Sequence, residues 1–297
     1  MSLQFEQVAG PFEFTEGPAW DGKGGILHSD IPNSRIMRYD VATGGCEEFR
    51  HGTNESNGLM FDRDGRLYGC EGGPDGRRVV RYEADGSTVC IADRFEGQRL
   101  NSPNDLAFDE QGRLWFTDPR YGDIEVDLEL DHQSVFRLEH NPAANTESWT
   151  ITRVTFDTTK PNGLLISQDQ QRLYVAQSHY QEGNARELRM YPIKGDGALG
   201  PYEVLHNFYP HRGIDGMCLD TEGNIIATAG SYVSGPGPMI YVFAPNGRVL
   251  ETHPVPVDMP TNCTFGDDDL RSLYVTASGC LFRVRTERTG HLTFPPS

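Results

Sequence analysis

The strongest constraint in this sequence is a pattern that occurs six times along its 297 residues. Each copy opens with Glu, Asn or Asp, usually followed by Gly and then by apolar residues, and successive openings lie 41 to 58 residues apart. A repeat of this size is typical of a chain built from one supersecondary unit per copy. The six opening residues are Glu16, Asn57, Asn104, Asn162, Asp215 and Asn262.

Each copy continues with further short apolar runs separated by Gly-rich turns, a pattern that favours strands. Five copies contain four strand-like runs, and the last copy lacks the fourth. We expect residues 3–9 to supply that missing strand and to close a ring. The sequence therefore predicts an all-β fold, a six-bladed β-propeller with four antiparallel strands per blade, in a single domain over 1–297. The alternative, a large β-sandwich or two β domains, gives no reason for a sixfold repeat.

Charge and hydropathy exclude several classes of protein. With 26 Lys and Arg against 43 Asp and Glu, the formal net charge is −17, which argues against nucleic acid as a partner. No run approaches the ~20 apolar residues of a membrane helix, so we expect no membrane partner. The first residues lack the basic and apolar regions of a signal peptide, so we expect a cytoplasmic protein, although a removed leader would leave no trace. The sequence leaves the oligomeric state open, and a monomer is compatible with it.

The opening residues predict a polar ring. The innermost strand of each propeller blade lines the central channel, so these six side chains should face the axis. Burying each of these polar groups without a hydrogen-bond partner would cost several kcal/mol, roughly the free energy of losing its hydration. Water or a cation must therefore interact with them. All six offer oxygen and two are carboxylates, which favours Ca²⁺, with Mg²⁺ as the alternative. An ion or water cluster that only holds the blades together is the competing interpretation.

Loop lengths indicate on which side of the ring a pocket is expected. The connection between the second and third strands opens on the face where the innermost strand begins. It covers only 31–33 in the first blade, but 119–133, 178–186 and 230–237 in the third, fourth and fifth. Long loops on a rigid scaffold are where small-molecule sites are usually found. We therefore expect a pocket above the ring members of those three blades.

Four motifs carry a resemblance to a known family. They are EGPAW at 16–20, RLNSPNDLAFDEQGRLWFTDPRYG at 99–122, PNGLLIS at 161–167 and DGMCLD at 215–220. In their order and spacing the chain resembles the senescence marker protein, gluconolactonase and luciferin-regenerating family of six-bladed propellers, and more distantly diisopropyl fluorophosphatase. The resemblance covers essentially the whole chain.

The resemblance implies one divalent metal ion on the axis, held by Glu16, Asn162 and Asp215. Asn104 would be a fourth ligand or a substrate contact. Ca²⁺ is the expected ion, and Mg²⁺, Mn²⁺ and Zn²⁺ stay open. Some members have a substrate-binding Arg two residues before the Asn of the SPND motif. Here Ser102 occupies that position, and Arg99 is the nearest candidate for the role.

The activity implied is hydrolysis of a lactone, which needs a polarised carbonyl, a delivered water and a stabilised oxyanion. Asp215 is the expected catalytic carboxylate, as base, as nucleophile or as ligand only. Tyr121 is expected to form a wall of the pocket, and His179 or its neighbour Tyr180 to contact substrate. His211, four residues before Asp215, is a further candidate. Strand alternation predicts that Asp105 points away from the axis and serves as an internal hydrogen-bond partner.

Three functions are compatible with these residues. The first is a metal-dependent hydrolase that opens a sugar lactone. The second uses the same site on another lactone, ester or phosphorus ester. The third is a propeller that binds a ligand or protein without catalysis, which two carboxylates converging on the axis disfavour. The sequence lacks a G-x-S-x-G elbow, an H-E-x-x-H motif and a Walker loop, so these rival chemistries have no support.

Overall fold

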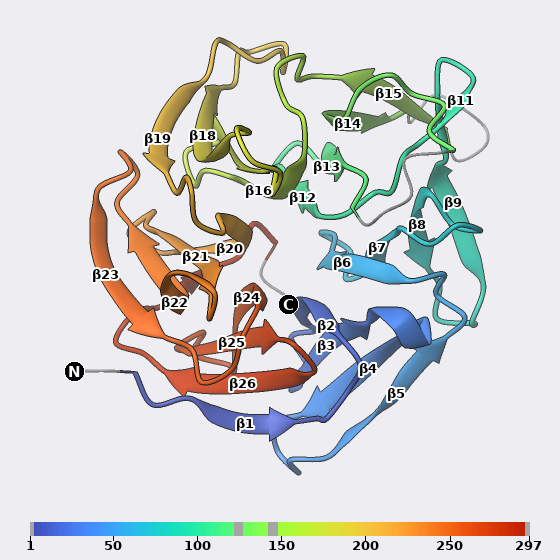
Figure 1. The fold of residues 1–297 in the computed structure, drawn as a ribbon. Helices are drawn as coiled ribbons and strands as arrows, with labels where there is room; N and C mark the ends of the chain where they lie inside the picture. Colours follow the sequence, from blue (N-terminus) through green and yellow to red (C-terminus); the bar gives the residue numbers. More distant parts are fainter. Residues whose placement is uncertain (1–2, 122–126, 142–147, 295–297) are drawn as a thin grey trace.

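The structure is a computed structural model that describes residues 3–121, 127–141 and 148–294. These residues form six antiparallel blades around a central axis, and Figure 1 shows the ring face-on. Within each blade the strands run in sequence order from the axis outward, except that the outermost strand of the sixth blade comes from the N-terminus. The six-bladed β-propeller predicted from the repeat is confirmed.

Blades one to three comprise, from the axis outward, β2 (Thr15–Trp20), β3 (Gly25–Asp30), β4 (Arg35–Asp40) and β5 (Cys46–His51); β6 (Ser56–Phe61), β7 (Leu67–Glu71), β8 (Arg78–Tyr82) and β9 (Thr88–Ala92); β12 (Leu106–Phe108), β13 (Leu114–Asp118), β14 (Ser134–His140) and β15 (Trp149–Arg153). Blades four to six comprise β16 (Pro161–Ile166), β17 (Arg172–Ser178), β18 (Arg186–Pro192) and β19 (Glu203–Asn207); β20 (Ile214–Asp220), β21 (Ile225–Ser231), β22 (Ser234–Phe243) and β23 (Val249–Pro254); β24 (Pro260–Gly266), β25 (Ser272–Ala277), β26 (Cys280–Arg285) and β1 (Glu6–Ala9). The described residues also include a hairpin of β10 (Arg94–Phe95) and β11 (Gln98–Arg99), the strand β27 (Gly290–His291) and a 3₁₀ turn, η1 (Ile31–Asn33).

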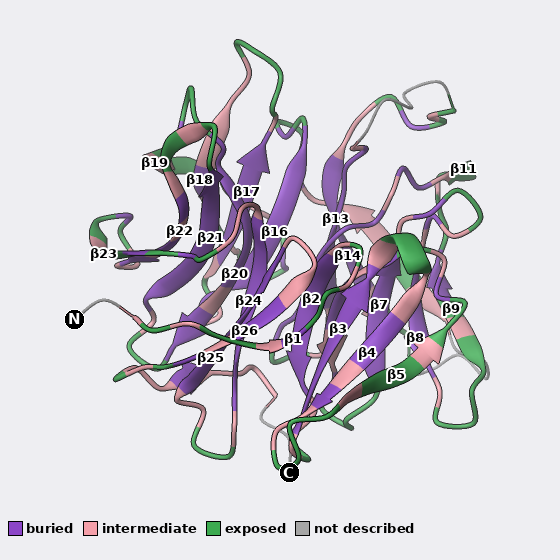
Figure 2. Ribbon diagram, turned by 60° about the horizontal axis from the view of Figure 1, so that its bottom comes forward, coloured by how far each residue is buried: buried purple, intermediate pink, exposed green. Residues whose placement is uncertain are grey.

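Each blade packs both of its faces against neighbouring blades, which explains why its middle strands are apolar without alternation. In β17, Leu173 and Val175 join the apolar cluster shared with blade three, while Tyr174 and Ala176 join the cluster shared with blade five. The described residues form one such cluster at each of the six blade interfaces. Figure 2 shows the buried inner strands in purple and the largely exposed β5 at the rim. The core is therefore a ring of interfaces around the axis.

The N-terminal strand closes this ring, as the sequence predicted. β1 lies outside β26 in the sixth blade, with Glu6 opposite Arg283 and Ala9 opposite Leu281. Phe5 packs edge-on against Phe282, with ring centroids 6.5 Å apart. Because the first residues complete the last blade, blades one and six are held together by backbone hydrogen bonds as well as by side-chain packing.

The C-terminal segment crosses the end of the channel opposite the long loops. β27 pairs with the innermost strand of blade five, Leu219 opposite His291. A Cβ on Gly290 would lie 2.2 Å from Cβ of Phe265, so only glycine lets this segment pass blade six so closely. The segment then reaches blade three, where the rings of Phe294 and Phe108 are 6.1 Å apart. This segment therefore lies across that end of the inner strands, leaving the opposite end for a site.

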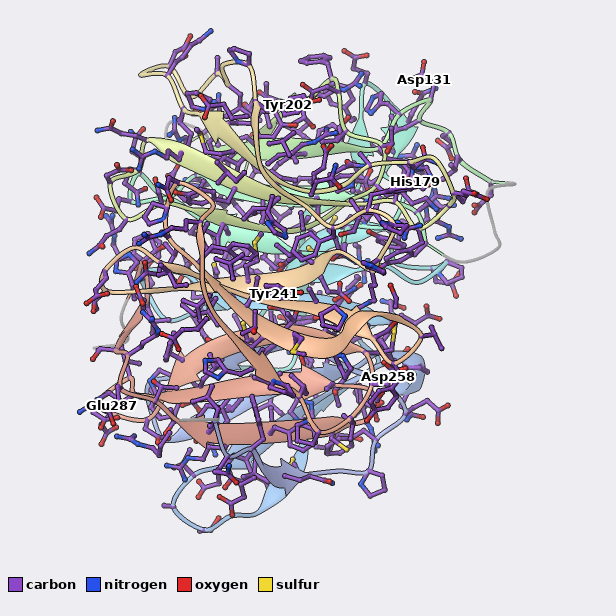
Figure 3. The ribbon with its side chains drawn as sticks, turned by 60° about the vertical axis from the view of Figure 1, so that its left-hand side comes forward. Asp131, His179, Tyr202, Tyr241, Asp258 and Glu287 are labelled. Carbon is purple, nitrogen blue, oxygen red and sulfur yellow. The ribbon has the colours of Figure 1, made fainter. Side chains whose placement is uncertain are left out.

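The opposite end carries the connections between second and third strands. In Figure 3, His179 (after β17) and Asp258 (before β24) lie on one side of the molecule, and Glu287 (after β26) lies on the other. The predicted third-blade connection at 119–133 separates β13 from β14, although 122–126 lie outside the described residues. The predicted fifth-blade loop at 230–237 is wrong, because β21 and β22 extend to Ser231 and Ser234, which pair with each other.

Glycine explains that error. Gly230 has a φ of +77°, and a Cβ there would lie 2.0 Å from the carbonyl oxygen of Gly237. The glycines interpreted as loop residues instead let two strands approach closely past an irregularity between Ala229 and Ser231. The described residues contain no helix long and apolar enough to cross a membrane.

Deleting residues 1–9 should lower the melting temperature, because it exposes the outer edge of β26 and removes the packing of Phe5. Phe5 is half-buried, so the loss of its packing should cost about 1 to 2 kcal/mol, less than the ~3 kcal/mol of a fully buried aromatic, which corresponds to a decrease on the order of several °C for a chain of this size. Thermal unfolding followed by circular dichroism measures this, with deletion of residues 1–2 as the control. An unchanged melting temperature would mean that β1 does not hold the ring closed.

Candidate functional site

The inner strands are interrupted where they pass the axis. The register shifts beside each ring position in β2, β6, β16, β20 and β24. In blade three, Asn104 N donates to the Thr117 carbonyl, and Thr117 N donates to the Asp105 carbonyl. Two residues of the inner strand, Asn104 and Asp105, therefore lie opposite the single residue Thr117. This is the signature of a β-bulge, which re-aims side chains that simple alternation would separate.

Three of the re-aimed side chains make the same kind of local hydrogen bond, in which each accepts from the backbone N–H of the next residue. Glu16 accepts from the backbone N–H of Gly17, Asp105 from that of Leu106, and Asn262 from that of Cys263. In blade three, Asp105 is therefore the counterpart of Glu16, one residue later than the predicted ring member Asn104. The expectation that Asp105 points away from the axis is wrong, because the bulge at 104–105 breaks the alternation. The expectation that it accepts internal hydrogen bonds is confirmed.

Close packing of the inner strands accompanies these bulges. A Cβ on Gly58 would lie 2.7 Å from Oδ1 of Asp105, and one on Gly163 would lie 2.2 Å from the carbonyl oxygen of Asp215. The glycine that follows Asn57 and Asn162 in the repeat is thus required by the approach of the next blade to the axis. This gives a physical reason for the Asn-Gly pairs that open the second and fourth copies.

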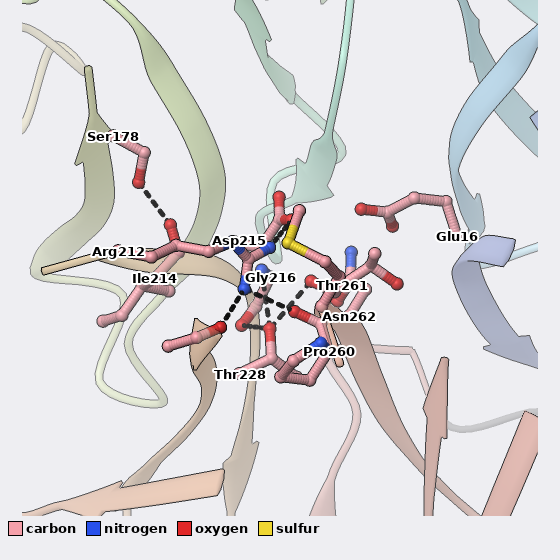
Figure 4. Close-up of polar contacts among 12 residues, drawn as sticks. Glu16, Ser178, Arg212, Ile214, Asp215, Gly216, Thr228, Pro260, Thr261 and Asn262 are labelled. Carbon is pink, nitrogen blue, oxygen red and sulfur yellow. Dashed lines mark hydrogen bonds and ion pairs between the residues drawn. The ribbon is translucent and has the colours of Figure 1, made fainter. Parts of the chain in front are cut away.

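Side-chain contacts bring most of the ring together. The amide of Asn162 lies close enough to lower the pKa of Asp215 and of Tyr121, and the amide of Asn262 lowers the pKa of Glu16 and of Asp105. Because the amide oxygen of Asn262 already accepts from Cys263, its N–H₂ group is the part that reaches the two carboxylates. Figure 4 shows Glu16 pointing from blade one toward this group. Asn262 is therefore part of the axial cluster.

The remaining ring members contribute through their backbone. Asn104 is buried, and its carbonyl accepts from Gly58 N at 2.8 Å. The carbonyl of the half-buried Asn57 accepts from the hydroxyl of Ser29 at 2.8 Å. Among the described residues, neither the Asn57 nor the Asn104 side chain forms a hydrogen bond with the axial carboxylates.

The carboxylates on the axis are held in an unfavourable environment. Burial, then the charges of Asp215 and Asp105, raise the pKa of Glu16 well above its usual value. Burial also raises the pKa of Asp105 to about 7 and raises that of Asp215, where the charge of Arg212 acts in the opposite direction. The folded chain thus removes three carboxyl groups from water without fully compensating their negative charge.

Arg212 is the cation of this cluster, and it was not among the residues singled out from the sequence. Its Nη2 donates to Oδ2 of Asp215 at 2.5 Å, and its Nη1 donates to the carbonyls of Gly230 and Pro260. Arg212 also interacts with the hydroxyl of Tyr180. Sequence inspection had singled out its neighbour His211, which is exposed at the rim. The sequence does place Arg212 three residues before Asp215, just ahead of β20, and this proximity could have suggested an ion pair.

Tyr121 and Tyr180 lie over the ring. Their ring centroids are 5.6 Å apart, and the Tyr121 hydroxyl donates to the carbonyls of Lys160 and Ser178 while Tyr180 contacts Arg212. Burial raises the pKa of both hydroxyls, to about 12 for Tyr180. Two neutral phenols therefore cover the side of the ring formed by blades four and five.

Two other predicted site residues have contacts elsewhere. The guanidinium of Arg99 donates to the carbonyl of Pro74 at 2.8 Å. His179 contacts Thr159 through Nδ1 at 3.0 Å and lines a surface cavity that also includes Asp131 and Phe156. The structure places neither side chain in a described contact with the axial cluster.

The donor set can be tested against a divalent cation. The carboxylates of Glu16, Asp105 and Asp215 face one guanidinium, so the ionised cluster carries a net charge of −2. Hard oxygen donors and this charge fit Ca²⁺ or Mg²⁺. Among the described residues no three His, Cys, Asp or Glu side chains converge as a complete ligand set, so amide oxygens would be needed to complete it. The residues fit a cation held by acids and amides together.

Comparison with known proteins gives consistent matches over the whole chain. Residues 14–279 match the family model described as the SMP-30/Gluconolactonase/LRE-like region. A gluconolactonase of Zymomonas mobilis is 30% identical over 98% of this chain and 83% of its own length. A pentonolactonase of Haloferax volcanii is 29% identical over 89% of this chain and 81% of its own. The solved structure of a gluconolactonase from Xanthomonas campestris superposes with a TM-score of 0.79 at 32% identity, covering 95% and 89% of the two chains.

Adding Ca²⁺ should raise the melting temperature, because a cation that binds only the folded chain stabilises it by about 2.7 kcal/mol at a hundredfold excess over Kd. The increase should be much smaller in Glu16→Gln, which removes one axial charge. The matched control is Glu13→Gln, three residues earlier and exposed. Differential scanning calorimetry in Ca²⁺ and in chelator measures the difference. An equal Ca²⁺ effect in both variants would contradict an axial site.

Proposed function

The chain belongs to the SMP-30/Gluconolactonase/LRE-like family, and from this premise we propose that it is a metal-dependent lactonase that opens the ring of a sugar lactone. The relatives named gluconolactonase and pentonolactonase support a lactonase activity. The observation that carries the proposal is the axial cluster, where three buried carboxylates face one guanidinium beneath two tyrosines.

Glu16, Asn162 and Asp215 would hold the cation, with Asn104 as the candidate for a fourth position. When bound, a divalent cation supplies Lewis-acid polarisation of a carbonyl and positive charge for an oxyanion. Ca²⁺ is the ion that the oxygen donors favour, and Mg²⁺, Mn²⁺ and Zn²⁺ stay within the proposal. The bulges that aim these side chains at one another are what this chain contributes to binding.

Hydrolysis joins the oxygen of a water molecule to the lactone carbonyl carbon and then breaks the bond from that carbon to the ring oxygen. One proton leaves the water and one reaches the departing alkoxide. Asp215 is the proposed group that accepts the first proton and returns it. Arg212 fixes one carboxylate oxygen of Asp215, so the orientation of the other is set before substrate arrives. Tyr121 and Tyr180 limit the access of bulk water.

The proposal is tested by a pH-indicator assay over a panel of lactones and esters, including a phosphorus ester. We expect hydrolysis of at least one five- or six-membered sugar lactone, lost in chelator and restored by one divalent cation. Hydrolysis of only the phosphorus ester would favour the second function suggested by the sequence. No turnover on the whole panel in metal-loaded protein would contradict a lactonase.

Asp215→Asn should reduce kcat by about 10² to 10⁴, the usual contribution of a general base, because it keeps an oxygen but removes basicity. Asn57→Ala is the control, since its side chain has no described contact with the cluster. Asn262→Ala is unsuitable as a control because Asn262 contacts Glu16 and Asp105. Metal content is measured on each variant first, and kinetics are run at saturating metal.

If Asp215→Asn keeps its metal and its turnover, the base lies elsewhere. Asp105 would then be tested before His179 or His211, since it is an axial acid that has no guanidinium partner and is not among the proposed metal ligands. If the variant has lost both metal and turnover even at saturating metal, Asp215 acts as a ligand only.

A further inference from the structure

The buried lysine at position 160 has no role in the site as described so far. Lys160 immediately precedes β16 and is only 7% exposed, whereas the other two lysines, Lys23 and Lys194, are exposed. Its carbonyl accepts from the backbone N–H of Ser178 at 2.9 Å, which fixes the backbone at the entrance to the axis. The position of this side chain is therefore set by the same strand that carries Asn162.

The ammonium group of Lys160 has an aromatic neighbour and no anionic one. Its Nζ lies 5.5 Å from the ring centroid of Tyr121. Within the part of the chain that the structure describes, Nζ makes no hydrogen bond and no ion pair. Nζ is not fully enclosed by the protein, so the small exposed part of this side chain includes its charge. The ammonium therefore opens onto free space.

The side chain of Lys160 is unusual because its stem is buried while its ammonium, which keeps some contact with solvent, has no ion-pair partner among the described residues. A lysine side chain buried to this extent is usually paired. Elsewhere in this structure the buried guanidiniums of Arg212 and Arg189 have carboxylate partners. Among the residues that the structure describes, Lys160 is the exception, because none of them supplies an anionic partner for its ammonium.

The location says what that anion belongs to. Tyr121 lies under the ammonium, and its hydroxyl donates to the carbonyls of Lys160 and Ser178, beside the strand that carries Asn162, so a group bound by Lys160 is near the proposed ligand set. With its three carboxylates ionised the axial cluster carries a charge of −2, which a divalent cation would balance without Lys160. The positive charge of Lys160 is surplus at the site of a protein whose net charge is −17. That local surplus is what an anionic substrate needs in order to approach and bind.

We propose that the preferred substrate is a lactone bearing an oxyanion substituent, a phosphate or a carboxylate, and that Lys160 binds that substituent. The proposal rests on the lactonase function proposed above and specifies its substrate class. The substituent lies away from the carbonyl that is attacked, so Lys160 is a specificity-determining residue. Tyr121 holds its ammonium in place through the cation–π contact.

The test compares kcat/KM for neutral glucono-1,5-lactone with kcat/KM for its 6-phosphate and for the 6-carboxylate, glucaro-1,5-lactone. In the metal-loaded wild type we expect at least one anionic lactone to be preferred by tenfold or more, and the better of the two identifies the oxyanion. Lys160→Met removes the charge but keeps the length of the side chain, and should lower this preference at least tenfold. Lys160→Arg should retain most of it, and Lys23→Met should not alter it.

A wild-type preference near one, or an equal preference in wild type and Lys160→Met, would overturn the proposal. A second measurement separates this result from failure of the lactonase function. Sodium sulfate, compared with sodium chloride at equal ionic strength, should raise the melting temperature of wild type and Lys23→Met more than that of Lys160→Met. If no lactone is turned over but this difference is found, the anion site stands and the lactonase function fails. If sulfate acts equally on all three proteins, there is no anion site at Lys160.

Discussion

Closure of the ring is the constraint on which the rest of this structure depends. Every blade buries both faces, so an open row of six blades would expose two apolar faces at its ends. Pairing of β1 with β26 brings the first and last blades together and removes both. The same closure fixes the distance of every inner strand from the axis. The crowding of polar side chains there is a consequence of completing the ring.

That crowding has an energetic cost, and the chain reduces it only in part. Arg212 offsets the charge of Asp215 and the amide of Asn262 favours ionisation of the other two acids, yet burial still raises the pKa values of Glu16, Asp105 and Asp215, and repulsion between carboxylates adds to the shifts of Glu16 and Asp105. Unfavourable electrostatics that survive in a folded protein cluster at functional sites. Positive charge from outside the chain would relieve them, which is the physical basis for both the cation and the lactonase proposals.

The two ends of the channel have separate tasks. At one end the segment from Gly290 to Phe294 connects the inner strands of blades five and three. At the other end Tyr121, Tyr180 and Lys160 lie near the approach to the ring. Small-molecule sites are usually carried by loops on a rigid scaffold, and the second end has that arrangement.

The sequence determined the fold and the identity of most axial residues, because a sixfold repeat with apolar strands on both faces can bury its surface only by closing on itself. It also determined that β1 completes the last blade, since one outer strand was missing. Only the tertiary structure decided the direction of Asp105, because a bulge breaks the alternation from which side-chain direction is inferred. Arg212 and Lys160 were likewise invisible, since their importance lies in which charges face them. A carboxylate opposite Arg212 and the lack of one opposite Lys160 are properties of residues brought together by the ring, and no local pattern encodes them.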